Sequence, residues 1–325
     1  MQYRKLGKSD LLVSEIGLGC SGFWGDRRFS DQKAMDIVLA AFKSGVNFFD
    51  TGSNYSNFNA EPRLGRAVKE VLKTHKRETI ILSTKAGSLS GYAPTVEDDD
   101  LSNTDFSPEA IEKSCLKSIE NLNCGHIDVF QLHGFTPKML NQELFDCLMS
   151  LKKRGLIRLI GVNTHFREDL VKIIEHNHIF DMVLIDCNVL QLDRFEIIQK
   201  LSDAGIGVVV GTVLAQGHLV SRKIGSFANG SFFWYLARTV IKPTTKDFFR
   251  SSSEMRSTLA SIKEMSPAQA AFAYLLDNAN ISSCLFGTTN QHNLADVLAA
   301  SGKRLSEDSR KKIEASYSKI KSLSR

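Results

Sequence analysis

The sequence has few of the features that mark secreted, membrane-spanning or metal-binding chains. Its six cysteines form no C-x-x-C pair and show no regular spacing, which argues against a disulfide framework or a structural zinc site. The apolar runs are of strand length, too short to cross a membrane, and no apolar stretch of signal-peptide length stands near the start. With six prolines and no low-complexity linker, we expect one cytoplasmic domain over residues 1–325.

The sequence also has only a small excess of charge of one sign. The net charge of +5 is mild for 325 residues, and no run of Lys and Arg with interleaved aromatic residues predicts nucleic-acid binding. The basic segment 303–312 also holds Glu307 and Asp308, which is typical of a solvated helix face. A hydrophobic content of 42% with 24% charged residues is typical of a globular enzyme and indicates no particular oligomeric state.

What the sequence does contain is a repeated alternation of short apolar runs and longer segments of helical period. The runs are near-continuous in hydrophobicity, as in parallel strands covered on both faces. Eight such units predict an α/β fold, a (β/α)8 TIM barrel with long loops at the carboxyl-terminal face. The predicted strands are 15–19, 46–50, 79–85, 127–133, 156–162, 182–188, 206–212 and 281–287, and the predicted helices are 31–44, 60–74, 107–122, 140–153, 167–176, 193–203 and 266–278.

Local signals support the ends of these helices. Ser107 and Ser266 each stand before a proline at the first helical position, which is a strong start signal. Gly45, Gly155 and Gly205 fall where three helices should stop before the next strand.

Three segments lie outside the alternation. Residues 2–15 are predicted to form a hairpin that turns at residues 7–10 and plugs the amino-terminal mouth of the barrel. Residues 88–106 and 217–262 are predicted to be long loops, and loops of this length are usually functional or disordered. The aromatic density of the second segment argues against disorder.

The stretch GLGCSG, residues 17–22, fits the G-x-G-x-x-G pattern of a Rossmann turn. A doubly wound sheet would open its first helix directly at this motif, whereas here the helix is predicted to start near Ser30. The next acidic residue after an apolar run, Asp50, lies 28 residues beyond Gly22, further than the roughly 20 expected of a ribose-binding acid. We therefore interpret the motif as the end of the first barrel strand.

Four reactive side chains follow three neighbouring predicted strands: Asp50 and Tyr55, then Lys85, then His133. Each has an ordinary explanation when taken alone, as a helix cap, a packed phenol, a solvated cation or a spectator imidazole. Because the carboxyl ends of barrel strands meet at one mouth, the four together predict a catalytic site.

The set has a definite chemistry. A neutral Tyr is a poor acid at pH 7, and a neighbouring cation favours its phenolate. Lys85 is expected to lower the pKa of Tyr55, with Asp50 holding Lys85 charged, so that Tyr55 serves as a general acid. A neutral His133 would orient or polarise a carbonyl. None of these groups carries a hydride and no metal constellation is visible, so a nicotinamide is the natural donor.

These features resemble the aldo-keto reductase family over nearly the whole chain. The resemblance implies a tetrad of Asp50, Tyr55, Lys85 and His133, with Tyr55 as the proton donor. It also implies an NADP(H)-type cofactor extended over the barrel mouth without a Rossmann domain, so that GLGCSG is not a pyrophosphate cradle. The blocks that carry the resemblance are GVNFFDTGSNYS, AEPRLGRAV, STKAG, IDVFQLHG, GLIRLIGVN, TVLAQG and SPAQAAFAYLL.

The cofactor positions depart from the family pattern in several places. Leu184 stands for the usual Gln and Cys187 for the aromatic residue that stacks on the nicotinamide, while Asn188 is kept. Thr289 stands where many members carry a cation for the 2′-phosphate, which leaves NADP(H) and NAD(H) both open. The resemblance implies cofactor contacts at Cys20, Ser21, Asp50, Asn163, Thr164, Cys187, Thr212, Leu214, Gln216, Gly217, Gly287, Thr288, Thr289, Asn293 and Asp296.

The sequence therefore predicts an NAD(P)(H)-dependent oxidoreductase that interconverts a small aldehyde or ketone and an alcohol. Phe23, Trp24 and Trp234 are expected to line the substrate site beside Tyr55 and His133. Mixed aromatic and polar loops favour a sugar or polyol. One alternative is a nicotinamide-binding sensor subunit on the same fold with little turnover, and another is a barrel isomerase or lyase, since fold alone does not set the reaction.

Overall fold

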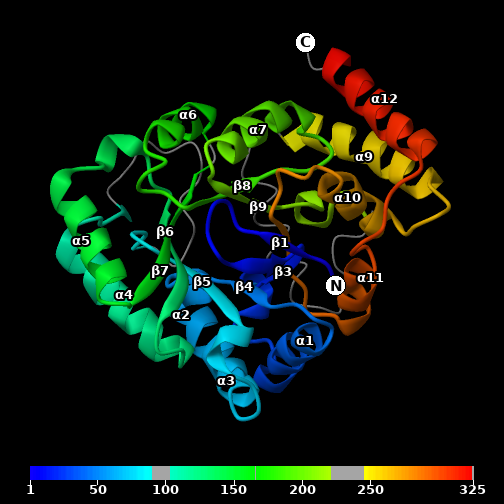
Figure 1. The fold of residues 1–325 in the computed structure, drawn as a ribbon. Coiled ribbons are helices and arrows are strands. Elements are labelled where there is room, and N and C mark those ends of the chain that lie inside the picture. Colours follow the sequence, from blue (N-terminus) through cyan, green and yellow to red (C-terminus); the bar gives the residue numbers. More distant parts are fainter. Residues whose placement is uncertain (90–102, 165, 221–244, 324–325) are drawn as a thin grey trace.

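The computed structural model describes residues 1–89, 103–164, 166–220 and 245–323. Eight parallel strands close into a barrel in the order β10-β3-β4-β5-β6-β7-β8-β9, and helices surround it (Figure 1). The predicted TIM barrel is confirmed, and each predicted strand overlaps one barrel strand. These are β3 (Ile16–Gly19), β4 (Phe48–Asp50), β5 (Ile81–Ala86), β6 (Ile127–His133), β7 (Ile157–Asn163), β8 (Met182–Asp186), β9 (Gly207–Gly211) and β10 (Ser283–Phe286).

The predicted helices are also present, within a few residues of their expected bounds. Short 3-10 turns at 22–24, 77–79, 137–139, 192–194 and 215–217 join several of the elements. The α-helices are α1 (Asp31–Lys43), α2 (Tyr55–Phe58), α3 (Ala60–Val71), α4 (Pro108–Leu122), α5 (Gln142–Lys153), α6 (Arg167–Glu175), α7 (Phe195–Asp203), α9 (Thr245–Ser261), α10 (Pro267–Leu276), α11 (Gln291–Leu298) and α12 (Glu307–Leu323).

The helix ends follow the local signals. The hydroxyl of Ser107 accepts a hydrogen bond from the amide of Ala110, and the hydroxyl of Ser266 accepts one from Gln269, so both serines are N-caps. Gly45, Gly155 and Gly205 have φ of 91°, 71° and 78°. Such left-handed backbone ends a helix at little cost only when the residue has no Cβ.

The prediction for residues 217–262 is wrong in part, because α9 occupies 245–261 of this segment. Its serine-rich sequence is a weak helix former, and local propensity alone does not reveal it. Met255 and Leu259 are fully buried, and α9 lies against α10 and α12 (Figure 1). Tertiary packing of an apolar face stabilises this helix.

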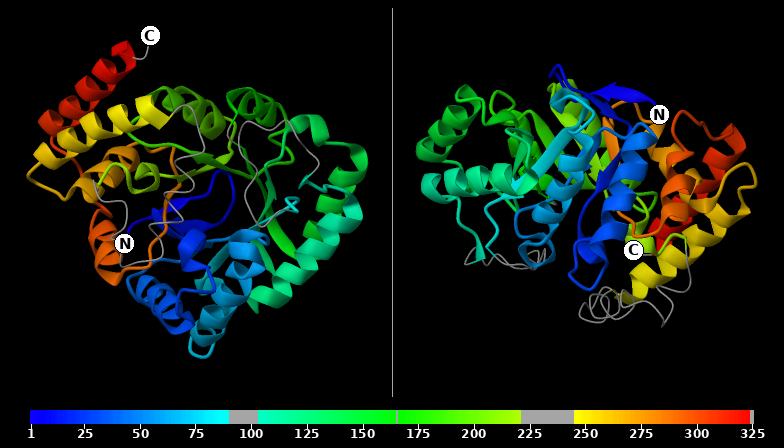
Figure 2. Two further views of the ribbon diagram at one scale, coloured as in Figure 1. Left: turned by 180° about the vertical axis from the view of Figure 1, so that it is seen from behind. Right: turned by 90° about the horizontal axis from the view of Figure 1, so that it is seen from below.

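The amino-terminal hairpin pairs β1 (Tyr3–Lys5) with β2 (Leu12–Ser14) and closes one end of the barrel (Figure 2). Leu6, Leu11 and Val13 are buried and pack on apolar side chains that point into the barrel from six of its strands. Burying an aliphatic side chain of this size contributes about 1.5–3 kcal/mol, so the hairpin stabilises the barrel floor. The predicted plug is confirmed.

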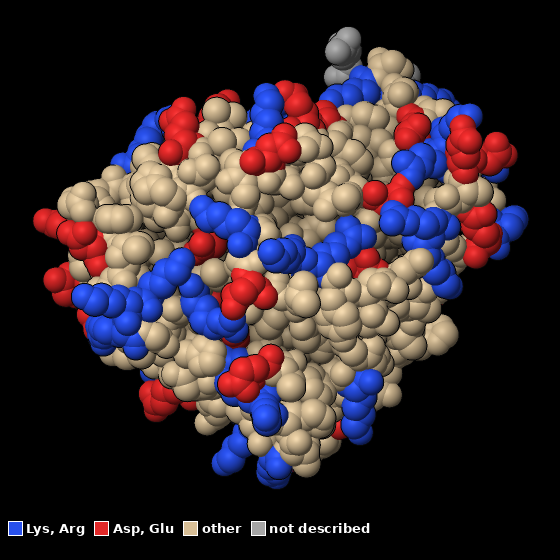
Figure 3. Space-filling model, in the orientation of Figure 1, with Lys and Arg blue, Asp and Glu red and all other residues tan. Residues whose placement is uncertain are grey.

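The outer surface is mixed in charge. Over the face shown in Figure 3, basic and acidic side chains are interspersed. Exposed side chains of opposite charge form pairs, such as Arg167 with Glu196. No helix within the described ranges is long and apolar enough to cross a membrane. All six cysteines lie in described segments and are free thiols.

Candidate active site

The inward-facing side chains divide the barrel into two layers. Residues two apart along a strand face the same way. The lower layer is apolar and meets the hairpin, and it includes Phe48, Ile81 and Val129. Two to four residues later, at the carboxyl ends of the strands, the same faces present a different set, here called the mouth layer: Gly19, Asp50, Lys85, His133, Asn163, Asp186, Gly211 and Gly287.

An ion pair joins two of the predicted tetrad residues in the mouth layer. The Nζ of Lys85 lies 2.5 Å from Oδ2 of Asp50 and donates a further hydrogen bond of 2.7 Å to the carbonyl of Thr51. Lys85 is fully buried and Asp50 is nearly so. A buried cation requires such a counter-charge, because desolvation of an unpaired ammonium is costly.

Tyr55 stands above this pair at the start of α2 and is half-buried. Its ring centroid lies 4.9 Å from Nζ of Lys85 and 5.4 Å from the ring centroid of His133, which meets it edge-on at 84°. His133 ends β6 and is buried. The structure therefore brings all four predicted residues together at one end of the barrel.

The electrostatics of Tyr55 differ from the sequence-based expectation. Burial raises the pKa of Tyr55 and outweighs the charge and hydrogen bond of Lys85, which lower it; the nearby carboxylates of Asp50 and Asp186 raise it further. Lys85 thus acts in the predicted direction, but the pKa of Tyr55 is raised overall. Burial works to lower the pKa of Lys85, but Asp50 and Tyr55 outweigh it, so that this pKa is raised. Both groups stay protonated at neutral pH.

Gln131 is a residue of this site that the sequence analysis missed. Its Nε2 donates to Oδ1 of Asp50 at 2.8 Å and to the hydroxyl of Ser83 at 2.6 Å, while Lys85 takes the other carboxylate oxygen. The two donors together orient the carboxylate plane. Strand alternation was the available signal, because Gln131 precedes His133 by two residues and so faces the same way.

Backbone strain gathers at the same end of the barrel. Of the seven non-glycine residues with positive φ in the described segments, six lie in the segments that follow β4 and β9, three of them within α2. Such conformations cost about 1–3 kcal/mol each and cluster at ligand sites. The six residues are Ser56, Asn57 and Phe58, directly after Tyr55, and Thr212, Ala215 and Gln216.

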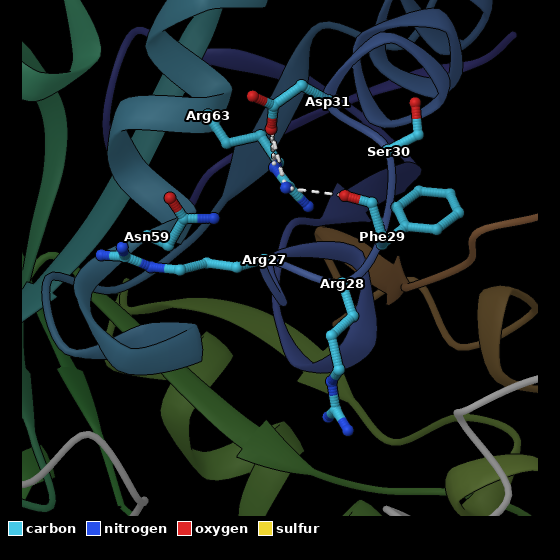
Figure 4. Close-up of a pocket in the computed structure, with 7 residues that line it drawn as sticks. All are labelled: Arg27, Arg28, Phe29, Ser30, Asp31, Asn59 and Arg63. Carbon is cyan, nitrogen blue, oxygen red and sulfur yellow. Dashed lines mark hydrogen bonds and ion pairs between the residues drawn. The ribbon is translucent and has the colours of Figure 1, made fainter.

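A separate polar pocket of about 440 Å³ lies in the loop before α1 and contains none of the tetrad (Figure 4). Arg63 crosses it, donating to the carbonyls of Trp24 and Phe29 and to the carboxylate of Asp31. Its guanidinium is buried and its donors are engaged within the chain. This pocket is held together by structural contacts, and the chemistry of the mouth layer makes that layer the better candidate for the active site.

Comparison with known proteins decides the family. Residues 15–318, most of the chain, match the aldo/keto reductase family. The chain belongs to this family. It is accordingly an NAD(P)H-dependent oxidoreductase.

Individual relatives are similar over almost their full length. YqkF, an uncharacterized oxidoreductase of Bacillus subtilis strain 168, is 26% identical, with 97% of this chain and 96% of the relative covered. L-galactose dehydrogenase of Arabidopsis thaliana is 26% identical over 99% and 96%. The NADH-specific methylglyoxal reductase of Escherichia coli K12 is 26% identical over 93% and 94%. The holo structure of aldo-keto reductase AKR11C1 from Bacillus halodurans has the same fold, with a TM-score of 0.76, 24% identity and coverage of 97% and 96%.

The mouth layer of this aldo/keto reductase leaves three strand ends without side chains. A Cβ at Gly211 would lie 3.3 Å from Oδ1 of Asp186, and one at Gly287 would lie 3.2 Å from the carbonyl of Gly19. These three glycines, here called the glycine side, form a backbone-lined surface that larger residues would fill. Such a surface suits a flat ring placed against the tetrad, so the residues present fit a nicotinamide.

Three residues predicted to contact cofactor or substrate are buried in this structure. Cys187 and Cys20 are fully buried and belong to the core between barrel and helices. Burial raises the pKa of Cys187 to about 12, which leaves its thiol inert at neutral pH. Trp24 is 2% exposed and its indole N–H donates to the carbonyl of Ala34, so it packs the fold and lines no substrate surface. At β8 it is Asp186, one residue before Cys187, that faces inward.

Three other predicted cofactor residues make contacts within the chain. The Nδ2 of Asn163 donates to the carbonyl of Leu184 at the barrel rim, and the hydroxyl of Thr164 donates to Asp169. Asp296 accepts hydrogen bonds from Ser266 and Gln269, which joins α11 to the start of α10.

The remaining predicted contacts lie at the ends of three strands. Ser21 follows β3, and the ring of Phe23 lies 5.7 Å from that of Phe29. Trp234 falls outside the described residues. Thr212, Leu214, Gln216 and Gly217 form the strained loop after β9, and Gly287, Thr288, Thr289 and Asn293 lead from β10 into α11.

Proposed function

We propose that residues 1–325 act as one catalytic domain that reduces a small aldehyde or ketone to an alcohol, or catalyses the reverse reaction. The observation that carries the proposal is the buried Lys85–Asp50 pair beneath the ring of Tyr55, with His133 edge-on to the same ring. The methylglyoxal reductase and L-galactose dehydrogenase among the relatives support a carbonyl or polyol substrate.

In this mechanism the proton moves through Tyr55. During reduction its hydroxyl donates to the carbonyl oxygen as negative charge develops there. The raised pKa of Tyr55 supports this role, because the acid form dominates at neutral pH. The charge of Lys85, held in place by Asp50, stabilises the phenolate that remains, and a ring N–H of His133 orients the carbonyl oxygen.

The cofactor would lie on the glycine side. A nicotinamide dinucleotide, when bound there, supplies or accepts the hydride. Gly19, Gly211 and Gly287 would border its ring, and the side-chain amide of Asn163, which belongs to the mouth layer, would bind a polar substituent. The loop after β9 and the start of α11 would hold the phosphates and adenosine. Both NADP(H) and NAD(H) are proposed as ligands, and we leave the preference to the binding experiment.

The deciding experiment combines a fluorescence titration with an assay. The wild-type chain and a Tyr55→Phe variant are titrated with NADPH and NADH and assayed against a panel of small carbonyl compounds. We expect both to bind cofactor and only the wild type to oxidise it in a carbonyl-dependent reaction. Tyr3→Phe, an exposed phenol on the hairpin, is the matched control and should retain activity.

Two outcomes would contradict the proposal. Failure of the wild type to bind either dinucleotide would exclude a nicotinamide enzyme. Tight binding with no turnover on any carbonyl compound would favour the sensor alternative, in which the fold responds to nicotinamide without catalysis.

A further inference from the structure

The side chain of Gln131 lies inside the barrel, one layer below the mouth layer. It is fully buried and in register with Lys85 on β5 and with Gly161 on β7. A Cβ at Gly161 would lie 2.8 Å from Cγ of Gln131, so the glycine leaves room for the longer side chain. Because Gln131 precedes His133 by two residues, the barrel holds a buried amide beneath the tetrad.

The hydrogen bonds of this amide fix its orientation. Its Nε2 donates to Oδ1 of Asp50 at 2.8 Å and to Oγ of Ser83 at 2.6 Å, whereas its Oε1 has no partner among the described residues. Turning the amide over would place Oε1 against the carboxylate, where two acceptors repel each other. A buried acceptor without a partner is costly, and an apolar side chain of the same shape would avoid that cost. The arrangement therefore favours a role of Gln131 at Asp50 over a role in packing.

The carboxylate of Asp50 in turn determines where the ammonium of Lys85 lies. The Nζ of Lys85 donates to Oδ2 of Asp50, and it also donates to the carbonyl of Thr51 and to the phenol of Tyr55. The terminal torsion of an Asp side chain is broad, so a single contact would not hold the plane of the carboxylate. Gln131 engages Oδ1 while Lys85 engages Oδ2. Without the amide, rotation of the carboxylate would draw the ammonium away from Tyr55.

We propose that Gln131 is a positioning residue of this enzyme, which acts through Asp50 to keep the ammonium of Lys85 at the phenol of Tyr55. It lies below the mouth layer, one step removed from the groups that we expect to contact substrate and cofactor. This inference rests on the proposed function and adds to it a residue that supports the proton transfer. Its removal should lower kcat and leave cofactor affinity unchanged, because only the stabilisation of the phenolate is weakened.

The pH dependence of the reaction offers a readout that packing alone would not change. Charged and titratable groups face Tyr55 from four strands: Asp50 on β4, Lys85 on β5, His133 on β6 and Asp186 on β8. On β3, burial raises the pKa of the Cys20 thiol well above its ordinary value, so this thiol is neutral. Gln131 itself does not titrate. A carboxyl introduced at its position would therefore add a new ionisation to the pH profile.

The test uses two substitutions that keep the length of the side chain. Gln131→Met removes the donor, whereas Gln131→Glu retains one only while its carboxyl is protonated. Two carboxyls that share a site do not ionise together easily, so one pKa of the pair formed with Asp50 is raised. We expect kcat of Gln131→Met to fall about 10- to 100-fold at every pH. Gln131→Glu should stay within about threefold of the wild type near pH 6 and fall to the level of Gln131→Met by about pH 9.

The assays use methylglyoxal and the rest of the carbonyl panel, with each variant compared with the wild type at the same pH. Dissociation constants for NADPH and NADH, measured by fluorescence, should change by less than about twofold in both variants. Thr84→Val is the matched control, because it removes a buried hydrogen bond of 2.6 Å to Glu61 on the outer side of β5. This control should lower stability and leave both kcat per folded molecule and the pH profile unchanged.

Three outcomes would overturn the inference while the proposed function stands. They are a normal kcat in Gln131→Met, an equal loss in Gln131→Met and Gln131→Glu at every pH, and a loss of cofactor affinity with kcat unchanged. If Gln131→Met does not fold, Gln131→Asn replaces it, because its shorter amide ends short of Asp50 and should give the same fall in kcat. If the wild type itself binds no dinucleotide or reduces no carbonyl compound, the proposed function fails and this inference fails with it.

Discussion

The two ends of the barrel both bury charge, but they use it in opposite ways. At the hairpin end, Asp128 on β6 accepts from Arg77 at 2.6 Å, from Arg158 at 3.2 Å and from the amide of Leu82 at 2.8 Å. At the mouth, the cation Lys85 is shared between Asp50 and the ring of Tyr55. At the hairpin end, Asp128 and its several donors form a closed network. At the mouth, the row of contacts from Asp50 through Lys85 ends on the half-buried phenol of Tyr55.

The pKa directions follow from this difference. Burial acts to raise the pKa of Asp128, but hydrogen bonds and cations outweigh it and the pKa is lowered. At the mouth, burial prevails over the charge of Lys85 and the pKa of Tyr55 is raised. We conclude that the hairpin end holds its charges for stability, while the mouth retains a proton that can be transferred.

The largest effect should come from Lys85→Met, which removes the contacts of Lys85 with Asp50 and with Tyr55. We expect carbonyl reduction to fall about a thousandfold, because the phenolate of Tyr55 loses its stabilising cation. Asp50 would also be left buried without its counter-charge, at a cost of about 3 kcal/mol in unfolding free energy. Steady-state kinetics and chemical denaturation measure the two effects. In the double variant Asp50→Asn/Lys85→Met, stability should partly recover and activity should not.

Leu6→Ala tests whether the hairpin end of the barrel contributes to stability without affecting catalysis. Removal of this fully buried side chain leaves a cavity beneath the barrel floor and should cost about 3 kcal/mol. Denaturant unfolding of the variant would show the loss. Turnover per folded molecule should stay within about twofold of the wild type, since the tetrad lies in the other layer. A large loss of turnover in the folded variant would show that the two ends are coupled.

Asp128→Asn should destabilise the hairpin end in a pH-dependent way. We expect a loss of about 2 kcal/mol at pH 7, because Arg77 and Arg158 lose their shared counter-charge. A lowered folded-state pKa means that the carboxylate stabilises the fold above the unfolded value near 4 and less as the pH falls below it. The difference in unfolding free energy between wild type and variant should therefore shrink below about pH 4. A constant difference down to pH 2.5 would argue against the ion pairs as its source.

The smallest effect should come from adding volume at the glycine side. Gly211→Ala introduces a Cβ 3.3 Å from Asp186 and should weaken cofactor binding about tenfold by displacing the ring or the carboxylate. Calorimetric titration measures it. Gly125→Ala, at another glycine with nothing within 4 Å of the added Cβ, should leave cofactor affinity unchanged, although its φ of 73° makes the substitution mildly destabilising.

The residues that were predicted correctly depended on local patterns. The eight strands, the hairpin and the serine and glycine helix ends follow from hydrophobic period, proline and glycine, which act over a few neighbours. The meeting of Asp50, Lys85 and His133 followed from topology, because parallel strands place their carboxyl ends together.

The residues that were missed or misplaced depended on contacts between distant parts of the chain. Cys187 is buried in the core whereas Asp186 faces inward, because a shift of one residue moves a side chain from one face of a strand to the other. Gln131 was missed because its role depends on a hydrogen bond to Asp50, which lies two strands away in the barrel. The helix α9 was missed because burial of Met255 and Leu259, more than propensity, holds it together.

The sequence by itself determined the order of strands and helices, the hairpin and the identity of the reactive groups. Only the tertiary structure decided which side chains face the mouth and which way the pKa of Tyr55 moves. The physical reason is the separation along the chain over which each interaction acts. Helix caps, turns and strand period are set by neighbours in sequence. Desolvation and the field of Lys85, Asp50 and Asp186 exist only after strands far apart in the chain have closed around Tyr55.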